Sequence, residues 1–173
     1  MTKKLVALAL LVAASGIAHG QAPEGNASGY AGIAIGGLSR ASGESSVAIG
    51  GKSKASEQGG VALGGKSEAS GEASVALGGK SEASGKASVA LGGEASTRGD
   101  FSVALGSRSE APETLTVSVG SNKLKRRIVN VEAGTGDFDA VNKAQLDAQA
   151  AEIADLKQRV TALMPEVAKL ASK

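Results

Sequence analysis

The chain contains no cysteine and no tryptophan, and both absences limit what it can be. Without cysteine, disulfide bonds and thiolate metal sites are excluded. The chain has one histidine, His19, and only three aromatic residues, Tyr30, Phe101 and Phe138. Histidine-based catalysis and a core built on bulky rings are therefore not expected. We predict a protein that is not an enzyme and that needs no cofactor and no metal.

Glycine, in contrast, is abundant at 25 residues, and much of it belongs to a repeat of 14 residues. Seven copies of a small apolar tetrapeptide ending in glycine follow one another at this spacing, from Ile33–Gly36 to Val117–Gly120. A fixed period predicts a repeat architecture in which each copy packs on its neighbours. Every copy then has the same surroundings, so no single cleft stands out as a catalytic site. The repeat favours a structural or binding rod.

The first residues have the pattern of an export signal. Two lysines precede a short apolar run, Leu5–Val12, and small residues follow it. We predict a secretory signal peptide over residues 1–20, with cleavage after Gly20 or Ala22. Its removal leaves 17 basic and 17 acidic residues, a formally neutral chain, so nucleic acid is not an expected partner.

Each repeat alternates as a β-strand does and then turns at glycine. In one copy Val61 and Leu63 share a strand face, and Ala62 points to the other. A second short strand is expected around Ala69, so each repeat is one coil of a mainly β solenoid that covers residues 23–121. The larger side chains of the first strands are predicted to form the core of this head: Val47, Ile49, Val61, Leu63, Val75, Leu77, Val89, Leu91, Val103 and Leu105.

One coil holds too few large side chains to order its own backbone unaided. Hydrogen bonds between stacked coils add stability, but the favourable contributions only about equal the entropy cost of ordering the backbone. The alanine face of the strands is then expected to pack against other chains. The sequence predicts an obligate oligomer.

After Gly120 the repeat stops, and a neck over residues 122–144 leads into a stalk over residues 145–173. Asp137 or Asp139 is the expected N-cap of the stalk helix. Pro165 should kink its last turns. The stalk has the heptad pattern of a coiled coil, with one polar core residue, Gln149, that would set register or strand number. Its predicted core residues are Leu146, Gln149, Ile153, Leu156, Val160, Leu163, Val167 and Leu170.

Together these motifs resemble the trimeric autotransporter adhesins with a YadA-like head. The head repeat is followed by Arg126–Val131, then by Ala133–Thr135, and then by Asp139–Asn142 with Ala144–Leu146, in the order of that family. The resemblance implies a homotrimer of left-handed parallel β-rolls, a neck that exchanges chains, and a coiled-coil stalk. It also implies that Arg126, Arg127, Asp139 and Asn142 are neck residues.

The implied function is that of an exported adhesin, which attaches through its head to host extracellular matrix or a cell-surface receptor. The alternative is a structural trimeric spacer or fibre component without a receptor. Two departures from the family affect these expectations. No aromatic-rich membrane anchor follows the stalk, so we expect either the cell surface or outer membrane, by resemblance, or a secreted or periplasmic chain. The residues before each Val-Ala-Leu/Ile-Gly also differ from those of collagen-binding heads, so the sequence does not support collagen as the ligand.

Several charged and aromatic features have two interpretations. The basic residues from Lys123 to Arg127 are expected to pair with neck carboxylates across chains, rather than to bind heparin or nucleic acid. Lysines at equivalent positions, such as Lys66, are expected to form a solvated edge with weak ion pairs. Tyr30 and Phe101 are candidates for adhesive contacts, although Phe101 could equally fill a gap near the neck. The match of Gly60–Ser67 to a phosphate-binding loop is attributed to the repeat, because no helix is expected to follow it.

Overall fold

The computed structural model describes residues 25–172, and the predicted signal peptide lies outside this range. The chain divides into two compact units, the first ending at Arg126 and the second beginning at Arg127. This division falls inside the segment predicted as the neck. The two units are described separately below.

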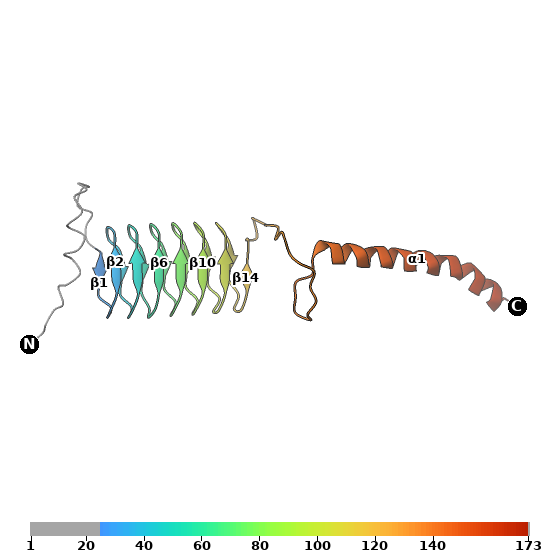
Figure 1. The fold of residues 1–173 in the computed structure, drawn as a ribbon, viewed down its shortest axis with the longest axis horizontal. Coiled ribbons are helices and arrows are strands. Elements are labelled where there is room, and N and C mark those ends of the chain that lie inside the picture. Colours follow the sequence, from blue (N-terminus) through green and yellow to red (C-terminus); the bar gives the residue numbers. More distant parts are fainter. Residues whose placement is uncertain (1–24, 173) are drawn as a thin grey trace, which may run out of the picture. The chain divides into compact units, whose positions relative to one another are not determined.

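The first unit is a parallel β-solenoid made of two seven-stranded sheets (Figure 1). Strands of two and three residues alternate along the chain from β1 to β13, and the last strand, β14, has two residues. Each coil contributes one strand to each sheet. Equivalent residues pair at the repeat spacing, as Val61 does with Val75. The strands are β1 (Asn26–Ala27), β2 (Ile33–Ile35), β3 (Arg40–Ala41), β4 (Val47–Ile49), β5 (Lys54–Ala55), β6 (Val61–Leu63), β7 (Glu68–Ala69), β8 (Val75–Leu77), β9 (Glu82–Ala83), β10 (Val89–Leu91), β11 (Ser96–Thr97), β12 (Val103–Leu105), β13 (Glu110–Ala111) and β14 (Val117–Ser118).

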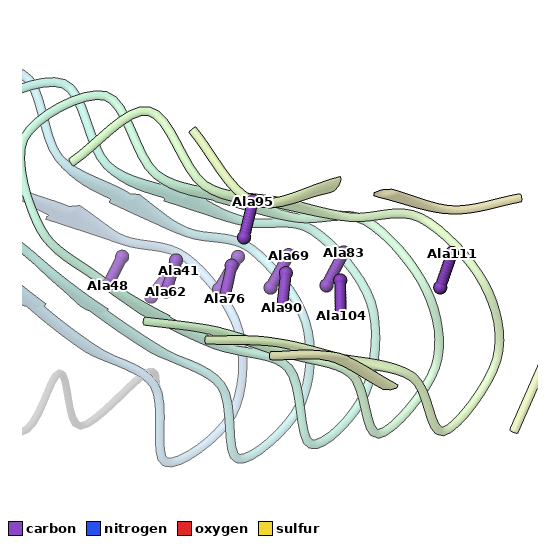
Figure 2. Packing of buried hydrophobic residues seen from close by; sticks show 11 residues of the cluster. Ala41, Ala48, Ala62, Ala69, Ala76, Ala83, Ala90, Ala95, Ala104 and Ala111 are labelled. Carbon is purple, nitrogen blue, oxygen red and sulfur yellow. The ribbon is translucent and has the colours of Figure 1, made fainter. Parts of the chain in front are cut away.

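The interior between the two sheets is filled by alanine and serine. Alanine side chains from both sheets point toward one another (Figure 2). Thr97 is the largest fully buried side chain among the described residues. Buried serines turn their hydroxyls to the backbone of the corners: Oγ of Ser46 donates to the Gly43 carbonyl at 2.7 Å and Oγ of Ser67 to the Gly64 carbonyl at 2.9 Å. These two hydroxyls are thus paired within the chain, whereas the buried Oγ atoms of Ser56 and Ser74 have no hydrogen-bond partner among the described residues.

The predicted head core is therefore inverted. Alternation correctly places Val61 and Leu63 on one face of β6 and Ala62 on the other, but Ala62 is the buried residue. A coil of 14 residues brings its two sheets so close that only small side chains fit between them. All the residues predicted to form the head core instead lie on the outer face of their sheet, half-buried or exposed: Val47, Ile49, Val61, Leu63, Val75, Leu77, Val89, Leu91, Val103 and Leu105.

Glycine is required at the first corner of each coil. Gly78 has φ +136°, a conformation that side chains rarely adopt. A Cβ on Gly78 would also lie 2.5 Å from the carbonyl carbon of Gly92 in the next coil. The same two constraints apply at the equivalent glycines Gly36, Gly50, Gly64 and Gly92.

The second unit contains one helix, α1 (Lys143–Ala171), preceded by an irregular loop. Asn142 caps the helix, and Pro165 lies inside it, with helix continuing to Ala171. None of the described helix residues is buried within the chain.

Candidate interaction surfaces

The sheet of β2, β4, β6, β8, β10, β12 and β14 presents an apolar outer face, which we call the apolar face. It carries the valine and leucine or isoleucine side chains of every coil, and several leucines remain exposed, Leu105 by 44%. Parallel sheets are normally covered on both faces. Here alanines cover one face, and none of residues 25–172 covers the other. The apolar face therefore requires a partner.

The outer face of the other sheet is polar. Lys54 Nζ lies 2.7 Å from Glu68 Oε1, between paired strands β5 and β7. Serine hydroxyls follow the charged residues, and Ser70 Oγ donates to Ser84 Oγ at 3.4 Å. Exposed ion pairs contribute little to stability, so this face is suited to solvent. The head is thus apolar on one side and polar on the opposite side.

Two of the three aromatic residues belong to the head, and both are exposed. Tyr30 is 82% exposed, and Phe101 is 55% exposed with a positive φ of 53°. Within the chain Phe101 does not fill a gap. Both rings are therefore available to a partner.

Arg126 closes the last coils of the head. Its guanidinium donates to the carbonyl oxygens of Val119, at 2.8 Å, and Ser107, and to the Ser109 hydroxyl at 3.0 Å. Within the chain its partners are thus backbone and hydroxyl oxygens, whereas the sequence suggested carboxylates. Arg127, the next residue, is exposed. Pairing of these arginines with carboxylates of another chain stays a prediction.

The N-terminus of α1 is held by Asn142 and not by Asp137 or Asp139. The Asn142 side chain accepts a hydrogen bond from the backbone amide of Gln145 at 3.1 Å and donates one to the backbone carbonyl of Val131 at 3.2 Å. Asp139 instead orders the preceding turn, accepting from the amides of Thr135 and Gly136 at 3.0 and 2.8 Å. These bonds, the one from Gly136 first, lower the pKa of the Asp139 carboxyl below its usual range, because they favour the charged form.

Gln145, the first residue of the predicted stalk, was not among the site residues predicted from the sequence. Its Oε1 accepts from the amide of Asn142, completing a capping box in which each side chain bonds to the other's backbone. The signal was readable, because asparagine followed three residues later by glutamine is the pattern of such a box. The prediction instead placed the cap at Asp137 or Asp139.

The large apolar residues predicted for the coiled-coil seam are exposed along α1. Ile153 and Leu156 are 52% and 47% exposed. Both belong to the row of apolar residues that recurs at heptad spacing along the helix. Such a stripe has no reason to face water over several turns. It supports association of the helix with others, and the assignment of seam residues stays a prediction.

Other kinds of site are not found among residues 25–172. They include no cluster of acidic or histidine residues able to hold a metal ion. They also include no helix that is long and apolar enough to cross a membrane.

Comparisons with known proteins agree with this architecture. The model of the YadA head domain repeat matches residues 27–53, 55–81 and 83–109, and the model of the coiled stalk of trimeric autotransporter adhesins matches residues 127–167. Among solved structures, the collagen-binding domain of the Yersinia adhesin YadA is 38% identical, with a TM-score of 0.68. The match covers 73% of this chain and 71% of that one. A search of curated protein sequences found no match.

A parallel β-solenoid with a 14-residue repeat, followed in the sequence by a helix with a heptad stripe, is the class that the fold defines. The chain belongs to the trimeric autotransporter adhesins with a YadA-like head. Its fold and family are those of an adhesin and not of an enzyme.

Proposed function

We propose that the chain acts as an exported homotrimer at the cell surface and attaches to host extracellular matrix or a cell-surface receptor through its head. One observation supports the assembly above all others: no part of the chain that the structure describes covers the apolar face. Three copies with these faces turned toward a common axis would remove them from water. The exposed heptad stripe of α1 would be covered in the same assembly.

The polar outer face of the head supports attachment, because it stays outside in such a trimer. A repeated surface shown three times lets weak single contacts add up through avidity. Collagen is the first ligand to test, since the related Yersinia head is a collagen-binding domain. Other matrix proteins and whole cells follow in the same assay.

Two measurements on the purified mature chain test this function. Light scattering should give the mass of three chains; a folded monomer would contradict the assembly. Binding to immobilised collagen, other matrix proteins and cultured cells should then saturate. A trimer that attaches to none of these surfaces would favour the structural spacer. Cell fractionation, with the protein at the surface as the expected result, tests its location.

A further inference from the structure

The ends of the apolar strands carry two columns of side chains that lie at opposite corners of the coil. After each apolar strand comes what we call the lysine corner: Leu38, Lys52, Lys66, Lys80, Glu94 and Arg108. Before each apolar strand comes what we call the glutamate corner: Tyr30, Glu44, Gln58, Glu72, Lys86 and Asp100. All these residues are exposed within the chain.

A contact between these two corners presupposes the proposed trimer. When three apolar faces surround one axis, their strands run around it, and the end of each strand points to the start of the next copy's strand. The contact joins two different surfaces of identical chains, as a closed threefold ring requires. The lysine corner of one copy therefore meets the glutamate corner of the next.

The lysine corner holds a groove whose floor is glycine. Gly51, Gly65, Gly79 and Gly93 line it, together with the side chains of the corner. The chain itself does not require these glycines: a Cβ on Gly79 would first meet the Gly65 carbonyl oxygen at 3.8 Å, and its φ lies outside the left-handed region. Glycine at such positions commonly marks the close approach of another backbone.

Charge selects which residues of the two corners meet. Each lysine-corner residue can meet the glutamate-corner residue either eight positions earlier or six positions later in the sequence. With about 4.8 Å between coils, these differ in height by only about 2.7 Å and 2.1 Å, so geometry favours neither strongly. The earlier partners give these pairs: Leu38–Tyr30, Lys52–Glu44, Lys66–Gln58, Lys80–Glu72, Glu94–Lys86 and Arg108–Asp100.

The alternative register is electrostatically poor. It sets Lys80 against Lys86 and Glu94 against Asp100, two like-charged pairs in adjacent coils. In the eight-residue register no like charges meet, even though each column contains one residue of the opposite charge. Glu94 interrupts the basic column and Lys86 interrupts the acidic one, and these two residues fall opposite each other.

Ion pairs within one chain account for each interruption separately. Glu94 lies 3.1 Å from Arg108 and 3.6 Å from Lys80, and Lys86 lies 2.9 Å from Glu72. They do not account for the two sign changes falling eight residues apart. Both side chains remain about half exposed, Lys86 by 52% and Glu94 by 47%, so each has surface left for a neighbour.

We propose that, in the trimer, the glutamate corner of each copy seats in the glycine-floored groove of the next copy, in the eight-residue register, with Lys86 paired to Glu94 of its neighbour. The partner is a second copy of this chain. Closure of the threefold ring already sets all copies at equal height, and the contact selects which side chains of neighbouring copies pair.

A double-mutant cycle on the full mature chain tests the pairing. Glu94→Lys and Lys86→Glu should each lower the melting temperature of the trimer, by about 2–5 °C. The combined variant should lose less than the sum of the two single losses, because the pair between copies is restored with its signs exchanged while the ion pairs within each chain stay broken. Within one chain the two residues lie at opposite ends of β10, so without the contact between copies their effects would add. Additive losses would overturn the proposal.

Cysteine pairing gives a second readout, made simple by the absence of native cysteine. A Lys86→Cys, Glu94→Cys chain should form covalent trimers with a short bis-maleimide cross-linker, because each copy then links to the next; a lysine–glutamate pair holds its Cβ atoms too far apart for a direct disulfide. Lys86→Cys combined with Ser84→Cys, a residue outside the lysine corner, is the control and should not give covalent trimers. If light scattering still shows a trimer but no covalent trimer appears, the corner contact is wrong while the proposed function stands. If no trimer forms even for the unmodified chain, the proposed function itself has failed.

Discussion

The Gln145 side-chain amide pairs with the Gly134 backbone through two hydrogen bonds. Its Oε1 accepts from the Gly134 amide at 3.0 Å, and its Nε2 donates to the Gly134 carbonyl at 2.9 Å. The same Oε1 accepts from the Asn142 amide at 3.2 Å. One side chain thus closes the loop of the second unit and caps its helix.

Replacing Gln145 should consequently loosen both the loop and the helix start. We expect Gln145→Ala to reduce stability by about 1–2 kcal/mol, since it removes a cap partner and leaves backbone groups unpaired. Thermal melting followed by circular dichroism measures the loss. Gln158→Ala, at an outward position of the same helix, is the matched control. Equal melting temperatures for the two variants would contradict the role given to Gln145.

The narrow interior of the head predicts different outcomes for two neighbouring residues of β9. Ala83 is fully buried, whereas Glu82 lies on the polar outer face. Ala83→Leu should destabilise the head by about 1–3 kcal/mol or prevent folding, because a close-packed interior has no room for added methylenes. Glu82→Leu should change stability by less than about 0.5 kcal/mol. Denaturant unfolding of both variants provides the test, and a tolerated leucine at residue 83 would show that the coils can expand.

These results show how much the sequence could predict. The spacing of 14 residues predicted the solenoid, its strands and their pairing, because a repeat forces equivalent residues into register. Alternation separated Val61 from Ala62 but could not say which face is inside. That choice depends on the distance between the sheets, which the corners set. The apolar residues were large enough to suggest a core, and the trimer axis is where their burial is now expected.

The neck was harder to predict because its contacts are not local. Arg126 reaches carbonyls of residues 7 and 19 positions away, and no sequence pattern announces such acceptors. Asn142 was implied by the family resemblance, but its role as helix cap emerged only from its bond with Gln145. Asp139 has a carboxylate that could cap a helix, but it accepts hydrogen bonds from the backbone amides of the turn before the helix.

Asp139 also predicts how the neck responds to acid. Since its folded pKa is lowered, the charged carboxylate stabilises the turn fully above the ordinary pKa of 3.8, and this contribution is lost as pH falls toward the folded value. NMR titration of the side-chain carboxyl should show a midpoint below that ordinary value. Asp139→Asn should remove this part of the acid response, while Asp137→Asn, at an exposed neighbour, should retain it. A midpoint at the ordinary value would refute the assignment.

Gln149 makes the sharpest prediction for the stalk. It occupies one place of the apolar heptad stripe, where a polar residue lowers stability but specifies register or chain number. Gln149→Ile should therefore raise the melting temperature of the assembled stalk, while light scattering detects species other than the trimer. Gln158→Ile adds the same side chain at an outward position, so it should leave both melting temperature and mass unchanged. If Gln149→Ile lowered the melting temperature, residue 149 would not belong to the seam, and the heptad register would have to be shifted.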